Sequence, residues 1–124
     1  MLNNSNVMAL IATSKPDEAK SFYSQTLGLR LLADEPFAIV FDAHGVMLRV
    51  QKVEKHTPQP YSVLGWEVAD IHASVDELLG KGVRCEQYES LGQNESGVWA
   101  SPSGAQIAWF KDPDGNTLSL TQFS

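Results

Sequence analysis

Apolar and polar residues follow a pattern along this chain that occurs twice. In the first occurrence, a short apolar run precedes apolar residues at helical spacing, and three extended runs come after them. The predicted strands lie at residues 7–13, 29–33, 37–41 and 46–53. Between the first two strands, Ser14 is expected to cap a helix, and Gly28 is expected to end it with a positive φ.

The second occurrence repeats this order. Asp70 is the expected N-cap of a helix whose apolar stripe includes Ile71 and Val75, and Gly80 and Gly82 follow it. The predicted strands lie at residues 61–68, 83–88, 97–100, 105–111 and 117–123. The polar segment 89–96 has no counterpart in the first half and reads equally well as a mobile lid or a plain surface connection.

The turns of the two halves can be aligned directly. Placing Gly45 on Gly115 brings Arg49 onto Ser119, with apolar residues matched on either side. This internal similarity predicts one supersecondary unit used twice, in an α+β fold of two βαβββ repeats with cupped mixed sheets. The expected organisation is a single domain, 1–124, with repeat 1 at 6–53, a linker at 54–60 and repeat 2 at 61–123. A pocket between the repeats would then be lined by equivalent positions.

Charge and composition narrow the function classes. The net charge of −6 argues against nucleic acids and anionic membrane surfaces as partners, because both attract basic proteins. No apolar stretch is long enough for a membrane span, and the N-terminus lacks the basic region of a signal peptide. The single cysteine, Cys85, fits a reducing compartment, so a cytoplasmic location is expected.

Strand alternation predicts which side chains line the concave faces of the sheets. These residues form an apolar floor with a few polar groups, as is typical of small-molecule sites. The expected ligand-binding residues are Met8, Met47, Arg49, Gln51, Glu67, Ser119 and Thr121, with Trp99 and Trp109 as possible aromatic walls. The same alternation places Trp66 in the core beneath the second helix.

Arg49 and Glu67 are the two charged residues of this set, and each has two interpretations. Arg49 either forms a structural ion pair with Glu67 or another neighbour, or receives a carboxylate of a ligand. Glu67 contacts a cationic ligand or acts as a general base if burial raises its pKa. Apart from Glu67 as a candidate base, no catalytic residue is predicted.

Two segments carry a resemblance to a known family. The sequence FYSQTLGL in the first half and FKDPDGNTLSL in the second resemble the vicinal oxygen chelate superfamily. That superfamily includes glyoxalase I, extradiol dioxygenases, fosfomycin-resistance enzymes and the metal-free bleomycin-resistance proteins. The resemblance covers residues 7–123, supports the two-repeat fold and implies a homodimer. It says little about function, because the fold hosts several chemistries.

The enzymes of this superfamily hold one divalent metal ion with ligands from four positions, usually histidine and glutamate. The resemblance carries these positions onto Met8, Arg49, Val63 and Ser119. A thioether is too soft for such an ion, valine has no donor atom, a serine hydroxyl is weak, and the arginine charge would repel the metal. We therefore expect no metal and no cofactor.

The resulting hypothesis is a metal-free, glyoxalase/bleomycin-resistance-like protein that binds a small organic molecule between its repeats. The alternative is a divalent-metal-dependent, glyoxalase-like isomerase or lyase, or a dioxygenase. A third possibility is a structural module whose concave face is filled by its own side chains. Whether the chain is an enzyme stays open at this point.

Overall fold

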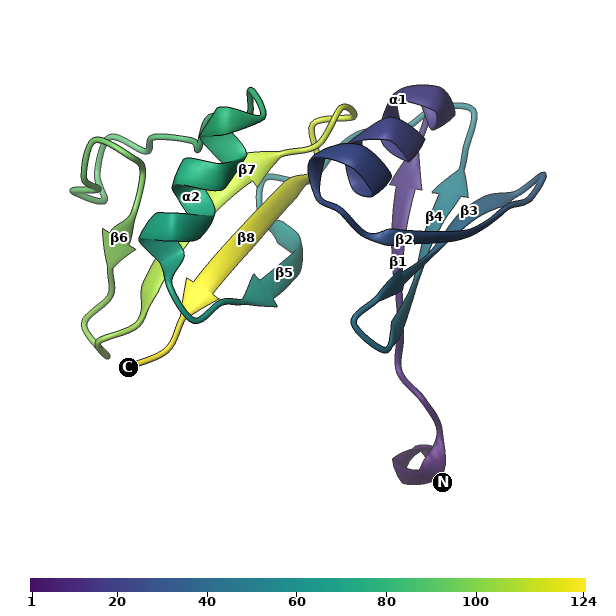
Figure 1. Ribbon diagram of the computed structural model, residues 1–124, viewed down its shortest axis with the longest axis horizontal. Coiled ribbons are helices and arrows are strands. Elements are labelled where there is room, and N and C mark those ends of the chain that lie inside the picture. The colour runs from purple at the N-terminus through teal and green to yellow at the C-terminus, as the bar shows by residue number, and fades with distance from the viewer. The chain divides into compact units, whose positions relative to one another are not determined.

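Two four-stranded mixed sheets, each with helical residues against one face, make up the computed structural model, which describes residues 1–124 (Figure 1). This arrangement confirms the predicted α+β class with two repeats. The chain divides into two units, Met1–Thr57 and Pro58–Ser124, and each unit holds one sheet. No helix has the length and apolar character that crossing a membrane would require.

The first sheet has the strand order β1-β4-β3-β2. A short 3-10 helix, η1 (Leu2–Asn4), precedes its strands β1 (Met8–Thr13), β2 (Arg30–Asp34), β3 (Ala38–Ala43) and β4 (Val46–Lys52). β1 runs parallel to β4, whereas β3 is antiparallel to both β4 and β2. The register between β2 and β3 shifts between Leu31 and Ala33, which interrupts the alternation of faces along β2.

The first helix begins one residue later than predicted. Lys15, and not Ser14, occupies the N-cap position, and its N–H donates to the hydroxyl oxygen of Thr13 at 3.0 Å. The reason is Pro16, which starts α1 (Pro16–Ser21) and disfavours a helical conformation for the residue before it. The helix continues as a π-helical segment, η2 (Phe22–Thr26), and Gly28 follows with the predicted positive φ, at 75°.

The second sheet repeats the topology with the order β5-β8-β7-β6. Its elements are β5 (Ser62–Glu67), α2 (Ile71–Gly80), β6 (Trp99–Ala100), β7 (Gln106–Lys111) and β8 (Thr117–Gln122). Asp70 caps α2 as predicted, because its carboxylate accepts the Ala73 N–H at 3.1 Å. Trp66 stacks on the fully buried Phe110, on the predicted side of the sheet, but it is only partly buried and lies at the edge of the core.

The strand predicted at residues 83–88 is wrong. That segment makes one backbone hydrogen bond to the sheet, from Glu86 N–H to the Trp109 carbonyl. The side-chain amide of Gln93 instead accepts the Tyr88 N–H at 2.6 Å and donates to the Glu86 carbonyl at 2.9 Å. These groups therefore cannot join a strand ladder, and the network favours an ordered surface connection over a lid.

Candidate functional site

Each sheet buries one face against its helix and leaves the other open. In the first sheet, Leu48 and Val50 are buried on the helix side, while Met47, Arg49 and Gln51 alternate with them on the open side. Met8 lies opposite Met47 in the register of β1 and β4, and half of its surface is exposed. The predicted alternation along these two strands is therefore correct.

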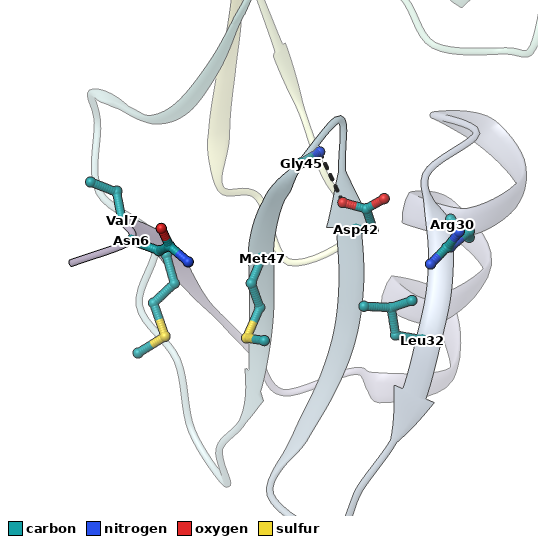
Figure 2. Close-up of a pocket in the computed structure, with 8 residues that line it drawn as sticks. Asn6, Val7, Arg30, Leu32, Asp42, Gly45 and Met47 are labelled. Atoms are coloured by element: carbon teal, nitrogen blue, oxygen red, sulfur yellow. Dashed lines mark hydrogen bonds between the residues drawn. The ribbon is translucent and has the colours of Figure 1, made fainter. Parts of the chain in front are cut away.

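A hollow of about 470 Å³ lies on this open face. It is formed within the first unit alone, by Asn6, Val7, Met8, Arg30, Leu32, Asp42, Gly45 and Met47. Figure 2 shows Met47 on β4 and Leu32 and Arg30 on β2. The Asp42 carboxylate lies beside the turn on β3, between those two strands. The hollow thus combines an apolar floor with one cationic and one anionic side chain.

The turn between β3 and β4 explains why Asp42 is placed there. His44 and Gly45 both have positive φ, at 51° and 91°, as a two-residue hairpin turn with the twist of the strands requires. The Gly45 N–H donates to Oδ1 of Asp42 at 2.9 Å, which fixes the carboxylate beside the turn. Asp42 thus belongs to β3, which ends at Ala43, although the sequence suggested a residue of the turn itself.

Arg49 has a partner on its own sheet. Its guanidinium Nη2 lies 3.3 Å from Oε1 of Glu35, the residue that follows β2. Of its two predicted interpretations, the structure favours the ion pair, with Glu35 as the neighbour involved. Glu67 belongs to the other unit, where it is exposed at the end of β5 and its carboxylate has no hydrogen bond or ion pair.

The open face of the second sheet carries other predicted residues. Ser119 shares a hydrogen bond with Ser62, with 2.7 Å between their hydroxyl oxygens. Gly65 lies beside this pair, because a side chain there would put its Cβ 2.7 Å from the Ser119 oxygen. Thr121 lies on the same face of β8 as Ser119 and pairs with Ile107 of β7.

Three aromatic rings gather on this second open face. The ring centroids of Trp99 and Trp109 are 6.0 Å apart, and Tyr88 meets Trp109 edge-on at 5.7 Å. Burial and the nearby charge of Glu86 raise the pKa of the Tyr88 hydroxyl, so it stays protonated at neutral pH. The two tryptophans contact each other, and Tyr88 adds a third ring that the sequence did not suggest; a role for either tryptophan as a wall of a ligand site stays a prediction.

The residues at the family's metal positions do not fit a divalent ion. The Arg49 guanidinium is held by a carboxylate, and the Ser119 hydroxyl by another serine. Elsewhere in the chain, no three His, Cys, Asp or Glu side chains come together in a way that could hold a metal ion. The donor set thus differs from that of the metal enzymes at every position.

Cys85 is unsuited to act as a nucleophile. Its side chain is buried, and burial together with the charge of Glu86 raises the pKa of the thiol. The reactive thiolate form is therefore scarce at neutral pH.

Several residues of the hollow were missed by sequence reasoning. These are Asn6, Val7, Arg30, Leu32, Asp42 and Gly45. No signal in the sequence alone pointed to Arg30 and Asp42, because the pairing of Asp42 with Met47 and of Arg30 with Asp42 depends on the strand register. Met8 and Met47 line the hollow, and all of the predicted ligand-binding roles stay predictions.

Comparison with known proteins places the fold in a family. A family model described as the Glyoxalase/Bleomycin resistance protein/Dioxygenase superfamily matches residues 6–120. No sequence among the curated proteins matches the chain.

Solved structures agree with this assignment. A superfamily member from Sphaerobacter thermophilus has a TM-score of 0.76 at 22% identity, with 98% of this chain and 99% of that chain covered. Lactoylglutathione lyase from Agrobacterium tumefaciens scores 0.70 at 18% identity, with coverages of 95% and 93%. TioX from a Micromonospora species scores 0.72 at 17% identity, with coverages of 98% and 100%. At these identities the likeness concerns the fold, and the family match over nearly the whole length carries the assignment. The chain belongs to the glyoxalase/bleomycin resistance protein/dioxygenase superfamily.

Proposed function

We propose that this protein binds a small organic molecule, without a metal ion, in the hollow on the open face of its first sheet. The observation that carries the proposal is the hollow itself. Its volume of about 470 Å³ lies within the range of small-molecule sites. An apolar floor and a few polar groups at its edge are the usual composition of such sites.

The floor is made largely of methionine and leucine side chains that water otherwise contacts. Met8 is 50% exposed, Leu32 47% and Met47 42%. Covering this apolar surface with a ligand would release water and stabilise the complex. Methionine side chains are flexible and polarisable, so the floor can adapt to ligands of different shape.

Metal independence is supported by the residues at the four family positions. Arg49 carries a fixed positive charge where the enzymes place a metal ligand, and Glu35 already pairs with it. The proposed mechanism is therefore simple binding, in which the hollow excludes water from the apolar part of the ligand and polar side chains orient the rest.

The three methionines of the chain provide a direct test. Met8 and Met47 line the hollow, while Met1 is fully exposed outside it. Protein labelled with ¹³C at the methionine methyl groups is titrated with norleucine, hexanoate, hexylamine and 1-hexanol, which share one unbranched carbon chain. We expect at least one compound to shift the Met8 and Met47 signals in a saturable manner and to leave Met1 unchanged.

The same spectra can also disprove the proposal. If none of the four compounds moved Met8 and Met47 more than Met1, the proposed binding at this hollow would be wrong. Addition of Zn²⁺ or Ni²⁺ serves as the second arm. Saturable binding of either ion at one equivalent, with shifts at Met8, would overturn metal independence.

A further inference from the structure

The hollow contains one positive and one negative side chain on adjacent strands. Arg30 of β2 and Asp42 of β3 are cross-strand partners in the antiparallel register. Both line the hollow, together with the apolar side chains of Met8, Met47 and Leu32 (Figure 2). Cross-strand partners place their Cβ atoms within about 5.5 Å, so the two charged side chains start close together and can contact the same small ligand.

These two groups do not neutralise each other directly. Three ion pairs join Lys20 and Lys52 to Asp34, and Arg49 to Glu35. Neither Arg30 nor Asp42 belongs to them, although they are in register. The guanidinium of Arg30 has no hydrogen-bond or ion-pair partner in the chain.

The hairpin turn accounts for the separation. Oδ1 of Asp42 accepts the Gly45 N–H at 2.9 Å, and this bond holds the carboxylate at the turn. Oδ2 of Asp42 has no donor within the chain. The hollow therefore presents a guanidinium with its donors available and a carboxylate oxygen with its lone pairs available.

We propose that the ligand of this hollow is a small zwitterion with an apolar body. This inference rests on the proposed function, because it names the class of molecule that the same hollow binds. The ligand carboxylate accepts hydrogen bonds from Arg30, and its ammonium group donates to Oδ2 of Asp42. The apolar body lies on Met8, Met47 and Leu32.

The pairing of charges distinguishes this class from simpler ions. A carboxylate without an ammonium group would meet the Arg30 guanidinium but would also be repelled by Asp42. An amine without a carboxylate would be attracted by Asp42 but repelled by the Arg30 guanidinium. A zwitterion satisfies both groups, and charge-assisted hydrogen bonds are the stronger ones in proteins. Selectivity should therefore lie in the head group, while the methionines tolerate variation of the body.

The test uses the full-length protein and the four compounds named above, with affinities measured by isothermal titration calorimetry. Norleucine is expected to bind at least about tenfold more tightly than hexanoate, hexylamine or 1-hexanol, since it alone makes both charge-assisted contacts. Equal affinity for all four compounds would overturn the zwitterion inference and leave the proposed function intact. Absence of binding by all four, with unmoved Met8 and Met47 signals, would overturn both.

Two variants separate the two charges. Arg30→Gln and Asp42→Asn should each weaken norleucine binding about tenfold. The carboxamide introduced by Asp42→Asn keeps an oxygen for the Gly45 N–H, so the turn is retained. The variants should also cross over: Arg30→Gln should strengthen hexylamine binding, and Asp42→Asn should strengthen hexanoate binding, because each removes a repulsion.

Matched controls lie on the other unit. Arg84→Gln and Asp76→Asn make the same charge changes at positions outside the hollow and should leave all four affinities unchanged. Arg30→Lys retains the charge and should retain most of the preference for norleucine over hexylamine. If norleucine affinity were equal in Arg30→Gln, Asp42→Asn and the controls, the assignment of the two charges would be wrong.

Discussion

Asp42 and Asp112 occupy equivalent positions in the two hairpins, counted back from Gly45 and Gly115. Asp112 is 6% exposed, and its oxygens accept the N–H groups of Asp114 and Asn116 and the side-chain amide of Asn116. Asp42 is half-buried and accepts one N–H, that of Gly45. One repeat thus uses the carboxylate to build its own turn, and the other leaves an oxygen available.

The length of the turn is the physical cause of this difference. In the second hairpin, residues 112–116 separate β7 from β8, so several backbone N–H groups converge on the carboxylate. In the first hairpin, two residues with positive φ suffice, and fewer donors come near Asp42. A repeated motif can therefore anchor its own turn fully in one copy and keep an acceptor oxygen available in the other.

The open faces of the two sheets also differ: the second is filled by its own side chains, and the first is not. The second face is occupied by the contacting rings of Tyr88, Trp99 and Trp109, whereas the first has exposed methionines around a hollow. Aromatic rings packed on one another stabilise the protein itself. Exposed thioethers around a hollow contribute less to folding, because much of their apolar surface stays in contact with water.

The largest expected effect concerns the anchoring aspartate. Asp112→Ala leaves buried N–H groups without an acceptor, so the free energy of unfolding should fall by about 3 kcal/mol. Asp42→Ala removes one bond at a more exposed site and should cost about 1 kcal/mol. Urea unfolding followed by circular dichroism measures both changes. Equal decreases in the free energy of unfolding would show that the two carboxylates stabilise their turns to the same extent.

Tryptophan fluorescence adds a local measurement to that experiment, because Trp66, Trp99 and Trp109 all lie in the second unit. The Asp112→Ala variant should lower the urea midpoint reported by fluorescence. The Asp42→Ala variant should leave that midpoint less affected than the one reported by circular dichroism, if the two units unfold separately.

The next comparison removes one side chain from each open face. Trp109→Ala loses contacts with two rings and should lower the free energy of unfolding by about 2 kcal/mol. Met47→Ala removes a side chain that is already 42% exposed and should cost less than about 1 kcal/mol. Urea unfolding measures both variants under the same conditions. A greater cost for Met47→Ala would mean that the first open face is packed in the working protein.

The sequence predicted the outline of this fold well. Strand alternation placed Met8 and Met47 on the same open face, and the Asp70 cap and the turn glycines were recognisable from local chemistry alone. Such features depend on a few neighbouring residues. They are therefore visible without knowledge of the tertiary structure.

Features that depend on distant contacts were not visible. The register shift near Leu32 moves Asp34 to the helix side of the first sheet, where Lys20 and Lys52 bind it. Simple alternation from Arg30 would have put Asp34 on the open face. Likewise, the amide of Gln93 removes a predicted strand by taking its hydrogen bonds. The pairing of Arg30 with Asp42 could be recognised only once the register was known.

The helix side of the first sheet provides a pH-dependent contrast between the units. Hydrogen bonds from Lys52 and Lys20 lower the pKa of Asp34 below its ordinary value of 3.8. This carboxylate should stabilise the folded state fully above pH 3.8, and the contribution should be lost as the pH falls through the lower folded-state pKa. The difference in unfolding free energy between wild type and Asp34→Asn should therefore shrink on acidification. Asp76→Asn, at an exposed aspartate of the second unit without an ion pair, is the control, and equal behaviour of the two variants would contradict the assignment.

The smallest effect is expected at Arg49, and it tests which arginine of the first sheet serves the ligand. Its single ion pair with Glu35 is 3.3 Å long and partly exposed, so Arg49→Gln should change the free energy of unfolding by less than about 0.5 kcal/mol. Norleucine affinity should also be nearly unchanged, because the guanidinium is already engaged and Arg30 is the one that lines the hollow. Calorimetric titration of Arg49→Gln beside Arg30→Gln measures this directly. A loss of norleucine binding in Arg49→Gln alone would move the carboxylate receptor from Arg30 to Arg49, the residue at the family's metal position.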